Sequence, residues 1–163
     1  MKILALDQAS KTSGYSIWND KELVSYGKFT FDDDDIGQRL MKIRNKVKTL
    51  ITENDIGYVI MEDIQVQQNN VQTFKVLAEV FGVIYELVTE MGIPNHAVLS
   101  SVWKSVVGIK GRARAEQKRN AQQHVTDTYG IKATQDESDA ICIGEYYVKK
   151  HLSFKEKTGF DWS

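Results

Sequence analysis

Three short apolar runs joined by tight turns fill the first 31 residues, and they restrict the fold more than any other feature. The first run covers residues 2–6 and ends at Asp7, the second covers 15–18 and the third covers 23–31. The connections at 10–14 and 19–20 are rich in Ser, Gly, Asn and Asp, which favour turns. Strand-like runs with such short connections pair antiparallel, so we expect the chain to begin with a three-stranded meander.

The hydrophobic period then changes to that of a helix. Apolar residues recur at helical spacing from Ile36 to about Asn54, after an acidic run at 32–35 that we expect to be a solvated loop. A second helix is predicted from Val71 to about Met91. Twelve of its positions between 71 and 88 are apolar, more than one sheet face can cover. Short apolar runs at 58–61 and 97–99 indicate a fourth and a fifth strand.

The C-terminal part is predicted to be helical. A short helix capped by Ser100 or Ser101 runs through Val107, a basic loop covers 108–114, and further helices cover 115–129 and 136 to about 151. The order β-β-β-α-β-α-β-α-α-α contains neither a repeat nor a linker. We therefore expect residues 1–163 to form one α/β domain, with a C-terminal tail from about residue 152.

Composition excludes several other classes of protein. Hydrophobic residues make up 42% of the chain and charged residues 26%, as in ordinary globular domains. The single cysteine, Cys142, excludes an internal disulfide and a thiolate metal site, and we expect it to lie in the core. The apolar start is too short for a signal peptide, and no apolar run approaches the ~18 residues of a membrane span. We expect a soluble, cytoplasmic protein.

The net charge of −1 conceals a strongly basic segment. Between residues 103 and 124 there are six basic residues and one acidic residue, which predicts a polyanionic partner. The basic residues are Lys104, Lys110, Arg112, Arg114, Lys118 and Arg119.

Four carboxylates stand at informative places along the chain. Asp7 ends the first predicted strand and Glu62 ends the fourth, which is where open α/β sheets bind ligands. Asp136 and Asp139 are three residues apart, so they share one face of the first turn of the last helix. Each alone has a structural explanation, such as a helix cap or a favourable interaction with the helix dipole.

Taken together, these carboxylates predict a metal site. Hard oxygen ligands, without cysteine or a suitably spaced histidine pair, favour Mg²⁺ or Mn²⁺ over Zn²⁺. Two such ions about 3.5–4 Å apart would clamp the attacking and leaving oxygens of a phosphodiester. The neighbouring acids Asp63 and Glu137 are predicted to point away from this site.

The motifs around these acids resemble those of the RuvC family of Holliday junction resolvases. The matching segments are 6–15 (LDQASKTSGY), 61–62 (ME), 106–109 (VVGI) with the lysine-bearing helix after it, and 136–140 (DESDA). The resemblance runs from residue 2 to about 150. It implies an RNase H-like fold with a central five-stranded mixed sheet flanked by helices, and a homodimer with two Mg²⁺ ions per site, for which Mn²⁺ substitutes.

The resemblance also assigns roles to residues. It implies that Asp7, Glu62, Asp136 and Asp139 are the catalytic metal ligands, and that Lys104 and Lys118 lie near the scissile phosphate. We expect Lys118 to stabilise the transition state, and the whole basic segment to bind DNA.

Three departures from the family pattern stand out. Gln8-Ala9 replaces the usual Pro-Gly after the first aspartate, and Gln65 stands where bacterial members carry an aromatic residue. The loop at 110–114 is longer and more basic than is typical. The loss of a stacking residue at Gln65 predicts weaker junction distortion or sequence selectivity, and the three departures together resemble the bacteriophage branch of the family.

The main hypothesis is therefore an endonuclease that resolves four-way DNA junctions by paired nicks. A less selective branched-DNA or flap endonuclease and a catalytically silent junction-binding dimer are the alternatives, and four intact acids disfavour the second. An actin-like ATPase would need a second glycine-rich phosphate loop, which the chain lacks. No motif in the sequence indicates which DNA sequence is cleaved or which branch-migration partner is bound.

Secondary candidates have structural explanations. The apolar helix at 71–88 is predicted to pair with its own copy in a dimer through Phe74, Phe81 or Tyr85. Trp103 is expected to have a core or hinge role, and His96 and His124 to be surface or strand-end residues.

Overall fold

A mixed five-stranded sheet forms the centre of the protein. The computed structural model describes residues 1–66, 69–152 and 159. The strands are β1 (Lys2–Asp7), β2 (Thr12–Asn19), β3 (Glu22–Thr30), β4 (Ile56–Glu62) and β5 (Asn95–Val98), in the order β3-β2-β1-β4-β5. The first three pair antiparallel, whereas β4 lies parallel to both β1 and β5. The predicted meander and the mixed sheet are confirmed.

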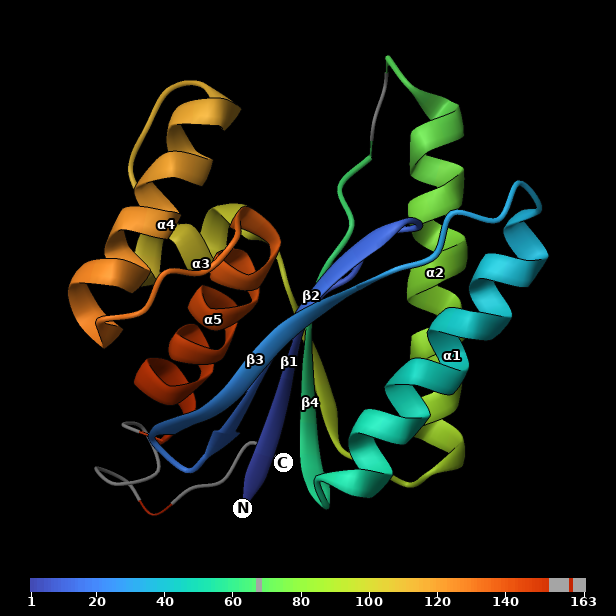
Figure 1. Cartoon of the computed structure of the whole chain (residues 1–163), viewed down its shortest axis with the longest axis horizontal. Coiled ribbons are helices and arrows are strands. Elements are labelled where there is room, and N and C mark those ends of the chain that lie inside the picture. The colour runs from blue at the N-terminus through green and yellow to red at the C-terminus, as the bar shows by residue number, and fades with distance from the viewer. Residues whose placement is uncertain (67–68, 153–158, 160–163) are drawn as a thin grey trace.

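Helices cover both faces of the sheet (Figure 1). On one face lie α1 (Ile36–Glu53) and α2 (Val71–Glu90). On the other lie α3 (Ser100–Val107), α4 (Arg114–Tyr129) and α5 (Gln135–Tyr147), and a π-helical turn, Val148–Leu152, follows α5. No helix in the described ranges is long and apolar enough to cross a membrane. The predicted tail from about 152 lies almost entirely outside those ranges.

The side chains of the strands pack into two separate hydrophobic cores, one on each face of the sheet. In β1, Ile3 and Ala5 pack toward α5, whereas Leu4 and Leu6 pack toward α1 and α2. The alternation follows from the two-residue period of a strand, and β4 repeats it. A strand that is apolar on both faces must be covered on both, and β1 and β4 are therefore the central strands of the three-layer structure.

Some predicted boundaries are wrong. Residues 12–14 belong to β2 and not to the preceding turn, because Ser13 closes a shorter turn by bonding both backbone groups of Ala9 at 3.0 Å. The N-cap of α3 is Leu99, and neither Ser100 nor Ser101 caps the helix. α5 starts at Gln135, after the N-cap Thr134, which forms a reciprocal capping box with Glu137.

The start of α5 lies directly against β2 at a glycine. A Cβ atom on Gly14 would lie 2.0 Å from the carbonyl oxygen of Asp136 and 3.0 Å from the amide nitrogen of Glu137. Two residues along the strand, the Ser16 hydroxyl donates to the Ala140 carbonyl at 2.7 Å. Only glycine allows this close approach, which fixes the first turn of α5 over the end of the sheet.

We predict that Gly14→Ala lowers the free energy of unfolding by about 3 kcal/mol, because the obstructing atoms are backbone and cannot rotate away. Gly27→Ala is the matched control on the adjacent strand, where the new methyl group meets only the outer ring atoms of Tyr15. Urea denaturation of both variants tests this. Equal losses would show that the close approach of β2 and α5 is not what requires glycine at position 14.

Candidate active site

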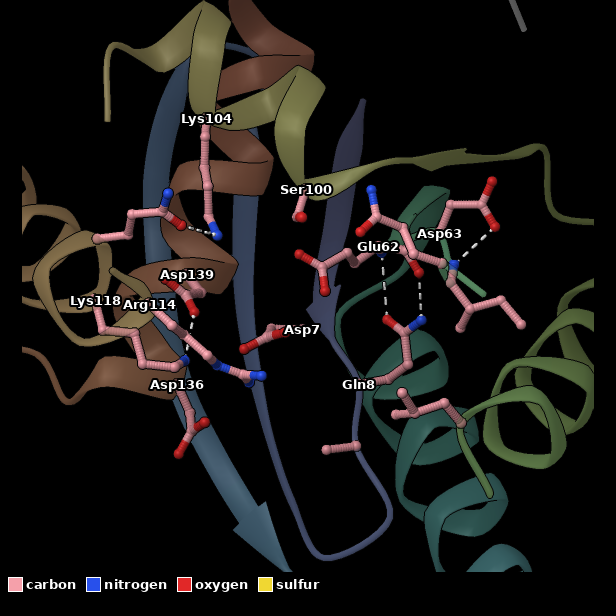
Figure 2. Close-up of a pocket in the computed structure, with 15 residues that line it drawn as sticks. Asp7, Gln8, Glu62, Asp63, Ser100, Lys104, Arg114, Lys118, Asp136 and Asp139 are labelled. Carbon is pink, nitrogen blue, oxygen red and sulfur yellow. Dashed lines mark hydrogen bonds and ion pairs between the residues drawn. The ribbon is translucent and has the colours of Figure 1, made fainter. Parts of the chain in front are cut away.

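The four predicted carboxylates line one cavity of about 370 Å³ (Figure 2). Asp7 and Glu62 end the neighbouring parallel strands β1 and β4, whose register pairs Leu6 with Met61. Asp136 and Asp139 enter from the first turns of α5. Glu62 and Asp139 lie 55 and 132 positions after Asp7 in the sequence. The pairing of β1 with β4 and the packing of α5 on the sheet bring them to the same cavity.

Burial and mutual repulsion disfavour the charged forms of Asp7, Glu62 and Asp139. Burial raises the pKa of Asp7 well above its ordinary value, and the charges of Glu62 and Asp139 raise it further. Burial also raises the pKa of Glu62 and of Asp139. A site in which several carboxylates disfavour one another's ionisation attracts cations.

Lys118 provides one such positive charge from α4. Its Nζ lies 3.0 Å from Oδ2 of Asp139, and both side chains are largely buried. Burial works to lower the pKa of Lys118, but the ion pair with Asp139 outweighs that effect and the pKa is raised. The lysine is therefore held charged inside the acidic cavity.

Two residues that the sequence analysis did not assign to the site hold Glu62. Trp103 donates its indole N–H to Glu62 Oε1 at 2.8 Å. Gln8 brackets the Glu62 backbone, donating to its carbonyl at 2.6 Å and accepting from its amide at 3.3 Å. Trp103 is fully buried, as its predicted core role requires. Two features of the sequence pointed to these contacts. A buried indole N–H needs a hydrogen-bond acceptor, and glutamine replaces the usual proline after Asp7.

The basic residues divide into two groups. Lys104, Arg114 and Lys118 line the cavity, and in Figure 2 the last two extend from α4 toward the acids. Lys104 donates to Gln117 at 2.9 Å. The other three, Lys110, Arg112 and Arg119, are exposed and lie outside the cavity lining.

Side chains of α4 hold the basic loop in place. Gln117 donates to the carbonyl of Gly111 at 3.0 Å, and Asn120 donates to that of Lys110 at 2.7 Å. Glu116 accepts from the amide of Arg112 at 3.1 Å. These three bonds order the loop before any ligand arrives.

The sequence analysis expected Asp63 to point away from the site, but this residue is among those that line the cavity. β4 ends at Glu62, so strand alternation does not extend to the next residue. The Asp63 carboxylate accepts the Ile64 amide at 2.9 Å and does not join the other acids (Figure 2). Glu137 does lie outside the cavity lining, because its carboxylate caps α5.

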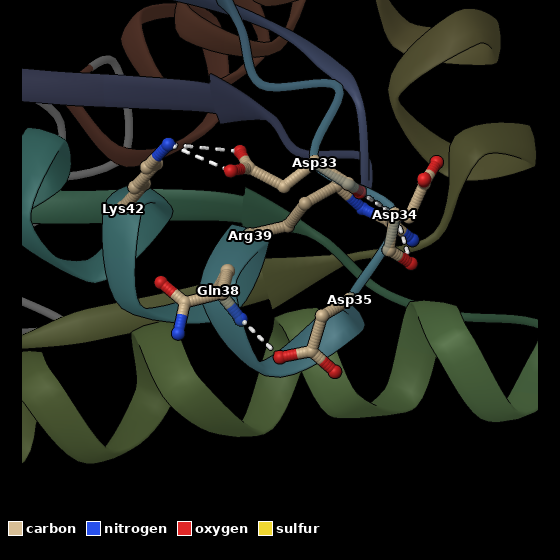
Figure 3. Close-up of polar contacts among 6 residues, drawn as sticks. All are labelled: Asp33, Asp34, Asp35, Gln38, Arg39 and Lys42. Carbon is tan, nitrogen blue, oxygen red and sulfur yellow. Dashed lines mark hydrogen bonds and ion pairs between the residues drawn. The ribbon is translucent and has the colours of Figure 1, made fainter.

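Beyond the cavity, the structure bears on two further expectations. The acidic run at 32–35 is a largely exposed loop, as predicted, and it also makes specific contacts, because Asp35 caps α1 and Asp33 pairs with Lys42 at 2.8 Å (Figure 3). His124 is not a free surface residue, because its Nε2 lies 3.0 Å from the buried Glu145 between α4 and α5.

Metal ions fit the chemistry of this cavity. Among the described residues, no group of three or more His, Cys, Asp or Glu side chains is arranged to hold an ion as it stands. Lys118 currently satisfies Asp139, and Trp103 satisfies one oxygen of Glu62. The four acids nevertheless offer hard carboxylate oxygens, the ligands that Mg²⁺ and Mn²⁺ prefer, and burial raises the pKa of Asp7, Glu62 and Asp139, so a bound cation would favour their charged forms.

The sheet order, the helices on both faces and the acids at the ends of β1, β4 and in α5 define the class of protein: an RNase H-like nuclease. Residues 3–145 match the family described as crossover junction endodeoxyribonuclease RuvC. The chain belongs to the RuvC family, and it is therefore a junction-resolving endonuclease of a metal-dependent type.

Individual relatives agree with this assignment. The RuvC of Ruegeria pomeroyi is 29% identical over 122 residues, which span 72% of this chain and 73% of that protein. The structure of Thermus thermophilus RuvC in complex with a Holliday junction substrate has a TM-score of 0.75 at 14% identity, covering 98% of this chain and 97% of the other. The fowlpox virus resolvase, also solved with Holliday junction DNA, has a TM-score of 0.62 at 16% identity, covering 93% and 99%. At these identities the two structures show the shared fold.

We predict that Asp7→Asn stabilises the metal-free protein at neutral pH. As pH rises above the ordinary aspartate pKa of 3.8, unfolded Asp7 loses its proton while the folded residue keeps it, so the native state is progressively destabilised. Asparagine does not titrate, so the variant's advantage should be absent near pH 3, grow as pH rises through the raised pKa, and then level off.

Urea denaturation in EDTA between pH 3 and 8 checks this, with Asp63→Asn as the control from the same cavity. A constant difference across that range, or the same gain from the control, would contradict the burial and repulsion assigned to Asp7.

Proposed function

We propose that Asp7, Glu62, Asp136 and Asp139 bind two Mg²⁺ ions and that the chain cuts four-way DNA junctions at this cavity. The observation that carries the proposal is the convergence of four carboxylates and three cationic side chains in one cavity of a RuvC-family chain. Mn²⁺ is expected to substitute, because the ligands are the same hard oxygens.

The protein's own groups have distinct parts in this reaction. The chemistry supplied by bound Mg²⁺ is Lewis-acid stabilisation of the attacking and leaving oxygens of the phosphodiester. Lys118, whose Nζ lies 3.0 Å from Asp139 Oδ2 inside the cavity, would present its ammonium to the phosphoryl oxygens and stabilise their added negative charge. Arg114 lies at the same cavity and acts on the phosphate in the same way. The expected product is a nick with a 5′-phosphate and a 3′-hydroxyl.

The exposed basic residues are proposed to bind the arms of the junction. Lys110, Arg112 and Arg119 are exposed and belong to the same chain segment as the cavity residues Arg114 and Lys118. Cationic side chains that meet phosphates release counterions, which gives binding energy independent of base sequence. The Thermus and fowlpox enzymes, both solved with Holliday junction DNA, support a branched substrate.

One observation favours a broader substrate range. Gln65 lines the cavity, and by the resemblance to the family it stands where bacterial members carry an aromatic residue that can stack on a base. Such stacking contributes about 1–3 kcal/mol per base, and glutamine does not supply it. We therefore propose that flaps and other branched DNA are cut as a secondary activity.

We also propose a homodimer formed through α2. Val80, Ile84, Leu87 and Val88 bury one face of α2 against the sheet and α1. The rest of the helix still exposes apolar surface, including 51% of Tyr85, which stacks on Phe81 with ring centroids 6.1 Å apart. A two-fold dimer through this surface would present two acidic cavities to opposite strands of a junction.

The setting of the enzyme is a proposal as well. We assign residues 1–163 to one nuclease domain that acts in the cytoplasm, since its substrate is DNA. The three departures from the family motifs also predict that the protein is encoded by a bacteriophage and acts in the cytoplasm of its host.

We predict that Asp7→Asn and Asp139→Asn each reduce junction cutting at least ~100-fold while leaving binding intact or stronger. The amide keeps the shape but removes the charge that a cation requires, and it lowers repulsion toward phosphate. Gel-shift binding and nicking of a synthetic mobile junction, an immobile junction, a flap and a linear duplex, with Mg²⁺ and with EDTA, measure both quantities. Asp63→Asn should retain activity.

The outcomes separate the alternatives. Full cutting by Asp139→Asn would refute the site assignment, and cutting of all four substrates at one rate would refute junction selectivity. Binding without cutting by the wild-type chain in Mg²⁺ and in Mn²⁺ would identify a silent junction-binding protein.

We predict that Phe74→Glu yields a folded monomer whose paired nicks become uncoupled, because a buried charge in the α2 contact is costly. Val24→Glu, at an exposed apolar position on β3, is the control and should remain dimeric. Sedimentation velocity at micromolar concentration and a cruciform plasmid assay provide the two readouts. A monomeric wild-type chain that still makes paired nicks would contradict the dimer.

A further inference from the structure

The indole N–H of Trp103 bonds to a carboxylate of the acidic cavity, although the ring itself belongs to the core. The ring is fully buried and lies in the same hydrophobic cluster as Ile60 of β4 and Val98 of β5. Its N–H donates to Glu62 Oε1 at 2.8 Å. A donor fixed by a rigid core holds its acceptor more closely than a mobile side chain would.

This bond restrains the part of Glu62 that nothing else fixes in the described structure. Gln8 bonds only the backbone amide and carbonyl of Glu62. Between that backbone and the carboxylate are three rotatable bonds, so the backbone contacts of Gln8 do not fix where the carboxylate points. The indole uses Oε1 and leaves Oε2 available to a cation.

Other contacts exclude a DNA-stacking role for Trp103. The ring has no exposed surface, so no base can reach its faces. The ammonium of Lys104 lies 5.4 Å from the ring centroid, within cation–π range, and is itself bonded to Gln117. The only polar group that Trp103 offers to the cavity is the N–H that Glu62 accepts.

We propose that Trp103 is a positioning residue whose indole N–H holds the Glu62 carboxylate in its metal-binding orientation. The inference rests on the proposed role of Glu62 as a metal ligand. Outer partners of this kind affect metal affinity by about 10–100-fold when removed.

The first test is spectroscopic and uses metal-free protein. The indole N–H resonances are assigned with Trp103→Phe and Trp18→Phe. Trp18 is the matched control, because it is equally buried and donates to the Ser16 hydroxyl at 2.9 Å, away from the cavity. Glu62→Gln weakens the acceptor, so the Trp103 resonance should move upfield while that of Trp18 stays in place. An unmoved Trp103 resonance would overturn the proposal.

The second test measures Mg²⁺ binding by calorimetry without DNA. We expect Trp103→Phe to weaken binding about 10-fold, Trp18→Phe to leave it unchanged, and all variants to bind a junction equally in EDTA. If Glu62→Gln weakens Mg²⁺ binding and a folded Trp103→Phe does not, the positioning role is wrong. If Glu62→Gln itself has no effect, the assignment of Glu62 as a ligand is wrong. Should Trp103→Phe fail to fold, the resonance shift decides.

Discussion

Burying Asp7 beside Glu62 and Asp139 is the constraint around which the rest of this structure is arranged. Carboxylates placed together in a poorly hydrated cavity repel one another and raise one another's pKa. Two of these acids have a specific partner, Lys118 for Asp139 and Trp103 for Glu62, which helps the fold to tolerate them. The parallel pairing of β1 and β4 forces the first two acids into adjacency, and the packing of α5 on β2 at Gly14 brings the third.

The two layers of helices have different roles, and the buried acids explain the difference. α3, α4 and α5 supply every cationic side chain of the cavity and the indole that restrains Glu62. α1 and α2 bury the other face of the sheet and leave part of α2 apolar and uncovered. Chemistry is thus confined to one face and the end of the sheet, while the opposite face supplies the surface that we assign to assembly.

The sequence was sufficient to predict the five strands and the grouping of the four acids, because both depend on local patterns. An apolar run that ends in a carboxylate identifies a strand end, and a three-residue spacing identifies a helix face. The remaining errors came from contacts between distant segments. No local pattern shows that Gln8 reaches the Glu62 backbone, that His124 meets Glu145, or that β4 ends before Asp63.

The tethering of the basic loop to α4 has a consequence for how quickly DNA is captured. A flexible cationic loop loses conformational entropy when it closes on a phosphate backbone, whereas this loop is already fixed by Glu116, Gln117 and Asn120. If the loop binds DNA as we propose, its charges would meet the phosphates as an ordered surface, and the entropic cost of ordering the loop would already have been met during folding. Glu116, Gln117 and Asn120, which carry no positive charge, would then affect the capture of DNA through the order that they impose on the loop.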